Sequence, residues 1–109
     1  MSTISIEDKW IDTVQLFGEV EQVVQEALRT YLIEQCQQRL DRASARIAIY
    51  QKKYGCSYDK FRQLIQTDEK FLAKVETQTP LWEEEAMEWE YWLEEQRTWR
   101  SRLNTILQR

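Results

Sequence analysis

The sequence is first informative through what it lacks: its 109 residues include no histidine, one proline, two glycines and two cysteines. Without histidine, the chain has no side chain whose ordinary pKa suits general acid–base catalysis near neutral pH. Two cysteines and no histidine cannot supply the four nitrogen or sulfur ligands of a structural zinc site. We therefore expect a protein that is not an enzyme, with no catalytic residues, no metal site and no cofactor.

Long apolar runs are missing as well. No segment approaches the roughly twenty apolar residues that a membrane-spanning helix needs, and residues 1–18 carry no signal-like cleavage pattern. In this context Cys36 and Cys56 are interpreted as reduced thiols that pack as small apolar side chains. These features predict a cytoplasmic protein that makes no use of a membrane.

The charge that is present is mainly acidic, with 19 acidic and 15 basic residues and a formal net charge of −4. Small nucleic-acid-binding proteins are usually basic, so this balance counts against DNA binding as the whole function. An acidic chain fits a partner protein that is itself basic. The scarcity of glycine and proline favours helix nearly throughout the chain.

The N-terminus is the exception to the helical pattern. Residues 2–6 alternate, with Ile4 and Ile6 on one side and Thr3 and Ser5 on the other, which predicts a short strand. A lone strand of this length is not stable, and the natural partner is the same strand of a second copy, paired across a two-fold axis. The alternative is an irregular tail before the first helix.

Apolar residues at helical spacing predict helices over residues 8–17, 19–53, 58–66, 68–75 and 81–107. Gly18 is expected to end the first helix, and Ser57 and Thr67 to cap the third and fourth. Thr79 followed by Pro80 marks the start of the last helix. A polar run over residues 35–41 suggests a change of packing partner, so we divide the chain into residues 1–42 and 43–109.

The order of these elements resembles the ribbon-helix-helix family of small dimeric repressors, the Arc/MetJ/CopG type, which includes many bacterial antitoxins. The resemblance covers residues 2–33: the Thr3-Ile4-Ser5-Ile6 strand, the first helix with Trp10 and Val14, the turn at Gly18, and the run from Val23 to Leu32. It implies a mainly helical fold with an intermolecular ribbon, followed by a long helix and a C-terminal helical region. It also implies a homodimer whose paired strands enter the major groove of operator DNA.

The resemblance assigns roles by position. Residues that point away from the core would contact DNA, with Met1 at the margin; together with the helix starts, the candidates are Thr3, Ser5, Lys9 and Gly18. The dimer core would consist of Ile4, Ile6, Trp10, Val14, Val23, Val24, Ala27, Leu28 and Tyr31. In this family, such a dimer represses its own operon and neutralises a cognate toxin, which we expect to be a ribonuclease.

The last predicted helix, residues 81–107, contains four of the five tryptophans and an acidic first half. Two interpretations are open: the tryptophans pack within the chain, or they anchor a partner, as exposed tryptophans often do. The second would place an acidic helix over the basic active site of a toxin. The first is favoured if the basic residues Arg46, Lys52, Lys53, Lys60 and Arg62 pair with this helix. The partner-binding candidates are Trp82, Glu84, Glu85, Trp89, Trp92 and Trp99.

The sequence thus predicts an antitoxin that binds a toxin and represses its operon as a dimer. A rival hypothesis is an all-helical scaffold or adaptor protein with no DNA role. A third is a free-standing transcription factor that senses a small molecule, which would need a pocket.

Overall fold

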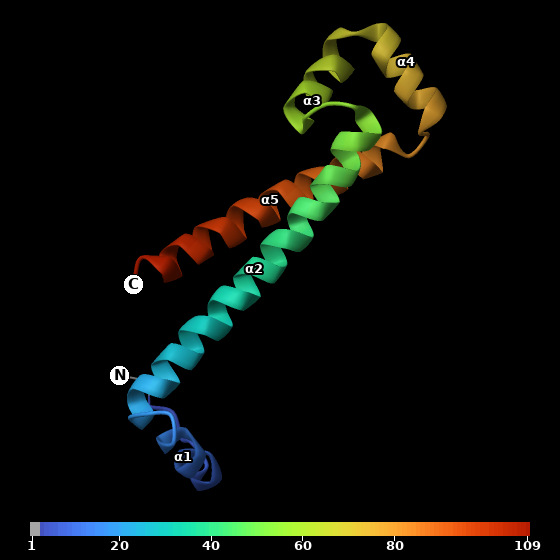
Figure 1. Cartoon of the computed structure of the whole chain (residues 1–109). Coiled ribbons are helices and arrows are strands. Elements are labelled where there is room, and N and C mark those ends of the chain that lie inside the picture. Colours follow the sequence, from blue (N-terminus) through green and yellow to red (C-terminus); the bar gives the residue numbers. More distant parts are fainter. Residues whose placement is uncertain (1–2) are drawn as a thin grey trace.

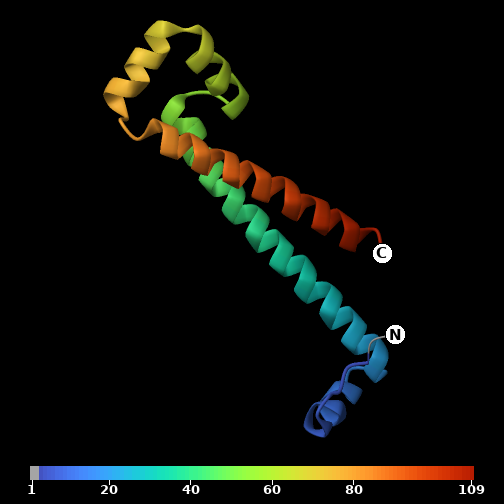
Figure 2. The same cartoon turned by 180° about the vertical axis from the view of Figure 1, so that it is seen from behind.

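The structure, a computed structural model, describes residues 3–109. It consists of five helices: α1 (Asp8–Gln15), α2 (Val20–Tyr54), α3 (Tyr58–Thr67), α4 (Glu69–Gln78) and α5 (Trp82–Leu107). The molecule is elongated, with extents of 68 × 24 × 22 Å, because α2 alone runs for 35 residues (Figure 1). Helix α1 lies at one end of α2, and α3 and α4 lie at the other (Figures 1 and 2).

The antiparallel pair of α2 and α5 forms the body of the molecule. Cys36, Ala43 and Ile47 of α2 are buried along the length of this pair. Polar contacts follow the same register: Arg46 Nη2 lies 2.8 Å from Glu88 Oε1, and Lys53 Nζ lies 2.7 Å from Glu85 Oε1. The two helices separate toward α1 in both views, where Arg29 still donates to the carbonyl oxygens of Ile106 and Arg109 at 3.1 and 3.3 Å (Figures 1 and 2).

The main core lies where α3 and α4 close over the far end of this pair. Trp89 and Phe61 are completely buried there, with ring centroids 5.5 Å apart. Tyr50 and Tyr54 of α2 stack on Trp89, each with a centroid separation of 5.8 Å. The core also contains Ile47, Val75 and Ala86. Because aromatic rings bury large areas, this cluster contributes strongly to the stability of the chain.

Local signals explain where the helices around this core begin and end. Gly55 ends α2 with φ +73° and donates its N–H to the Gln51 carbonyl oxygen at 2.8 Å. Glycine suits this left-handed conformation because it has no Cβ. Ser57 caps α3 as predicted, since its Oγ accepts from the Lys60 N–H at 3.2 Å. Asp68 caps α4 through the Phe71 N–H at 3.1 Å.

The predicted intermolecular ribbon is wrong. Within residues 3–109 the structure has no strand, and residues 3–7 form irregular chain before α1. Met1 and Ser2, which the prediction placed at or beside the strand, lie outside the described residues. The alternation of Ile4 and Ile6 has another explanation: extended chain of any kind alternates its side chains, and both residues line one groove together with residues of α2. The fold class is therefore all-helical.

The predicted helices are all present, with changes at their ends. The first ends at Gln15, two residues early, since Leu16 and Phe17 form a tighter turn. Thr67 is the last residue of α3, not the cap of α4. Helix α5 begins at Trp82, because Thr79, Pro80 and Leu81 form a turn closed by the Trp82 N–H and the Thr79 carbonyl oxygen at 3.0 Å. The boundary placed after residue 42 falls inside α2, which continues through it (Figure 1).

Candidate protein-binding surface

The surface that the chain leaves most exposed is its N-terminal part. We call residues 3–33, which comprise residues 3–7, α1 and the first half of α2, the arm. Leu16 and Phe17 at the turn are 82% and 79% exposed, and Ile4 is 75% exposed. Trp10, Leu28, Tyr31 and Leu32 are also exposed. Exposed large apolar side chains that are contiguous on a surface usually mark an interaction site.

The turn between α1 and α2 explains why two of these side chains face solvent. The Leu16 and Phe17 N–H groups donate to the carbonyl oxygens of Thr13 and Val14, at 3.2 and 2.9 Å. Gly18 follows with φ +143°, a conformation that L side chains rarely adopt. The chain reverses within these residues and α1 packs against α2, where Val14 and Val23 are half-buried. Leu16 and Phe17 therefore lie on the outside of the turn.

A groove runs along the arm between residues 3–7 and α2. Its apolar lining consists of Ile4, Ile6, Val20, Val24 and Leu28, and its volume is about 670 Å³. Glu19 and Glu21 stand at its rim together with glutamines. We call this feature the arm groove. The arm groove is wide and open. It therefore suits a segment of another polypeptide better than a small molecule, which usually binds in an enclosed pocket.

The arm also carries the entire net charge of the protein. Its six carboxylates, on Glu7, Asp8, Asp12, Glu19, Glu21 and Glu26, face only two basic side chains, on Lys9 and Arg29. The six minus two give −4, which equals the formal charge of the whole chain, so the remaining residues are balanced. Lys9 already lies 3.2 Å from Glu7 Oε2. An apolar and acidic surface is complementary to an apolar and basic one.

A contrasting basic surface lies next to the arm, where α2 and α5 pack. Arg39 and Arg102 lie on Trp99 at 4.6 and 4.5 Å from the ring centroid to the guanidinium carbon. Arg42 and Arg46 lie on Trp92 at 5.3 and 5.7 Å. We call these six residues the Arg–Trp face. Cation–π contacts hold the guanidinium groups in place while leaving N–H edges available to bind, although Arg46 is already paired with Glu88.

The acidic start of α5 is engaged within the chain. Glu88 accepts from Arg46 and from the Tyr50 hydroxyl, and Glu85 from Lys53. The hydrogen bond from Tyr50, and after it the one from Arg46, holds the pKa of Glu88 below its usual range. Burial, then the same bond, raises the pKa of Tyr50 to about 12. Two of the predicted intrachain pairs, from Arg46 and Lys53, are thus present, which favours the packing role for this helix.

The partner-binding candidates of α5 lie in different surroundings, some buried, some paired and one exposed. Trp89 is completely buried, and Trp82 and Trp92 pack against the same core. Trp99 is covered by arginines, and Glu85 is paired with Lys53. Glu84 remains exposed. As placed, these side chains do not form one surface open to a partner.

The DNA-binding and dimer-core candidates lie in the N-terminal part of the structure. Thr3 and Ser5 are exposed in irregular chain, Lys9 lies on α1 and Gly18 in the turn, so they do not share a strand face. Of the dimer-core residues, Ile6, Val14, Val23 and Val24 are half-buried, and Ile4, Trp10, Ala27, Leu28 and Tyr31 are exposed. Their burial by a second chain stays a prediction. The exposure of Leu16 and Phe17 and the Arg–Trp face were not predicted from the sequence, although arginines three and four residues apart were a readable signal.

Other kinds of site find no support in the part of the chain that is described. Residues 3–109 contain no cluster of three or more acidic, cysteine or histidine side chains placed to hold a metal ion. Cys36 and Cys56 are both free, and burial raises the pKa of the Cys56 thiol. No described helix combines the length and the apolar character needed to cross a bilayer.

Comparison with known proteins adds no assignment to this geometry. No protein-family model, no curated protein and no solved structure matches this chain.

Proposed function

We propose that this protein is a non-enzymatic interaction module that enters a protein complex through its arm. The observation that carries the proposal is the coincidence of two properties on residues 3–33. Among residues 3–109, the three large apolar side chains with the highest exposed fractions, Ile4, Leu16 and Phe17, lie on the segment that carries all of the net charge. A solvated tail would be charged without exposed apolar side chains, and a core segment would be apolar without this charge. A segment that exposes both is typical of a binding surface.

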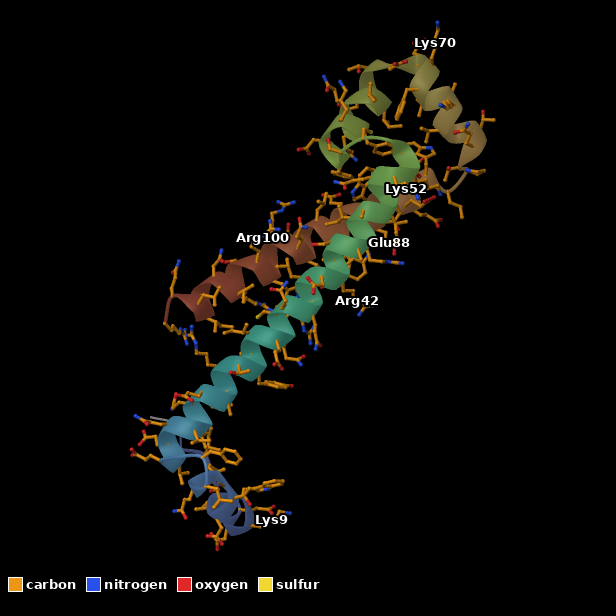
Figure 3. All side chains as sticks on the ribbon, viewed as in Figure 1. Lys9, Arg42, Lys52, Lys70, Glu88 and Arg100 are labelled. Carbon is orange, nitrogen blue, oxygen red and sulfur yellow. The ribbon has the colours of Figure 1, made fainter. Side chains whose placement is uncertain are left out.

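The rest of the fold suits such a role. The core around Trp89 and Phe61 lies at the end of the molecule opposite α1, so the arm contributes little to it (Figure 1). Lys9 on α1 and Lys70 on α4 mark these two ends in Figure 3. A partner can therefore cover the arm without disturbing the core. The partner surface that fits is apolar with basic residues around it.

The antitoxin function implied by the resemblance is one form of this proposal. A toxin that cuts RNA has a basic active site, and the acidic arm would attract it and exclude its substrate. An adaptor that links other proteins is the alternative, and it would use the arm in the same way. Operator binding through paired strands has no place in either form, because residues 3–7 do not form a strand.

Native mass spectrometry of the full chain, coexpressed with the product of its adjacent gene, tests the proposal. We expect a complex, either with that product or between copies, that is lost when Leu28→Asp or Phe17→Asp places a charge on the arm. Met87→Asp is the matched control, since Met87 is 73% exposed on α5 and far from the arm. A wild-type chain that stays a lone monomer, or complexes that survive both arm variants, would overturn the proposal.

A further inference from the structure

One face of α2 continues from the arm to the Arg–Trp face. Glu21, Val24, Leu28, Tyr31, Gln35, Arg39 and Arg42 follow one another in steps of three or four residues, which places them on one side of a helix. The contacts agree: Val24 and Leu28 both line the arm groove, and Arg39 and Arg42 both lie on tryptophans of α5. We call this line of residues the α2 stripe. It is acidic and apolar in its first half and basic in its second.

We infer that the arm is covered by a second copy of this chain, packed antiparallel along the α2 stripe. This inference rests on the proposed function and assigns the occupant of the same surface. A stripe that is acidic at one end and basic at the other is complementary to itself only when the second copy runs in the opposite direction. A parallel pair would set Glu21 against Glu21 and Arg42 against Arg42 of the second copy, which like-charge repulsion opposes.

The exposed apolar residues locate the two-fold axis. Leu28 and Tyr31 of the stripe and the neighbouring Leu32 are 43%, 57% and 46% exposed near its middle, where an isologous contact would bury them against the second copy. With the axis between Tyr31 and Leu32, Glu21 lies level with Arg42 of the second copy, and Val24 with Arg39. Each interface then contains this charge pair twice.

The Arg–Trp face is suited to receive an acidic arm. Arg42 lies on Trp92, and within residues 3–109 no carboxylate is paired with it. Arg39 and Arg102 both lie against the Trp99 ring, and neither has an ion pair in the same part of the chain. A guanidinium group held against an indole loses little freedom when it binds a carboxylate, so the interface is partly preorganised.

A charge-swap cycle measured by sedimentation equilibrium of the full-length protein tests the inference. We expect a dimer in the wild type that weakens as salt is raised. Glu21→Arg and Arg42→Glu should each weaken it about tenfold, since each replaces two attractive pairs by two repulsive ones. The double variant, with both changes, should recover wild-type affinity within about threefold. Glu26→Arg with Lys52→Glu makes the same charge changes on other faces of α2 and should leave the dimer unchanged.

Tyr31→Asp supplies a test that does not depend on the arginine contacts. Because Tyr31 is exposed in the single chain, this variant should keep its helical circular dichroism and lose the dimer. A wild type that is monomeric at all concentrations, a dimer that survives Tyr31→Asp, or a double swap without recovery would each overturn the inference. A monomer that binds the adjacent gene product through the arm would overturn only this inference and leave the proposed function standing.

Discussion

The buried tryptophan of α5 offers the sharpest test of whether this helix serves packing or partner binding. Trp89 is completely buried and contacts four aromatic rings, from Tyr50, Tyr54, Tyr58 and Phe61, at centroid distances of 5.3 to 5.8 Å. Replacing a buried tryptophan by alanine removes these contacts and leaves a cavity, which costs about 3–5 kcal/mol. Since domains of this size are stable by about 5–15 kcal/mol, Trp89→Ala should remove a large part of the free energy of unfolding.

A second substitution at the same position keeps an aromatic ring in the core and removes the indole N–H. The Trp89 Nε1 group is buried and has no hydrogen-bond acceptor in the described part of the chain. Phenylalanine would keep most of the ring area and remove this unsatisfied donor, so Trp89→Phe should cost about 1–2 kcal/mol. Trp10→Ala is the matched control: Trp10 is 55% exposed, and the expected change is within about 0.5 kcal/mol.

Urea unfolding followed by far-ultraviolet circular dichroism measures all three variants, with the slope of the transition checked for constancy. The expected order of destabilisation is Trp89→Ala, then Trp89→Phe, then Trp10→Ala. If Trp89→Ala cost no more than Trp10→Ala, Trp89 would not lie in the core, and the partner-anchoring interpretation of α5 would regain its support.

Three further changes test local features of the fold. Gly55→Ala forces a Cβ into the left-handed region at φ +73° and should lower the free energy of unfolding by about 1–2 kcal/mol; no loss would mean that α2 ends elsewhere. Asp68→Ala removes the cap of α4 and should cost about 1 kcal/mol, whereas Thr67→Ala, one residue earlier, should cost less; the reverse order in urea melts would restore Thr67 as the cap. Glu88→Gln tests the lowered pKa of Glu88. Because the folded state binds this proton less tightly than the unfolded chain, the contribution is present above about pH 4.5 and is lost as the pH falls through the folded pKa. The variant should therefore be less stable than the wild type near neutral pH and approach it in acid, and a constant difference in urea midpoints across this range would contradict the assignment.

Much of the helical architecture was predictable from the sequence, because its causes are local. Apolar spacing located all five helices to within three residues at each end, and Ser57 was identified as a cap from its neighbours alone. The errors at Thr67 and Thr79 arose where two residues compete to cap one helix, and only the backbone conformation of Asp68 and of the turn over Thr79–Leu81 decides the outcome.

The strand at residues 2–6 was a wrong prediction for a different reason. Four alternating residues are compatible with any extended chain, and only a neighbouring strand turns such a segment into part of a sheet. In the structure Ile4 and Ile6 line an open groove beside Val20, Val24 and Leu28 of α2, and no described strand pairs with them. The exposed Leu16 and Phe17 were missed because the helix was expected to include them.

The sequence by itself determined which segments are helical and where the charge is concentrated. It also determined that the histidine for acid–base catalysis and the ligands for a zinc site are absent. Only the tertiary structure decided what each side chain of α5 does. Whether Trp89 is buried or Trp99 lies against two arginines depends on the antiparallel register of α2 and α5, which pairs residues 32 to 77 positions apart. That register is set by the packing of many side chains at once, and no local pattern encodes it.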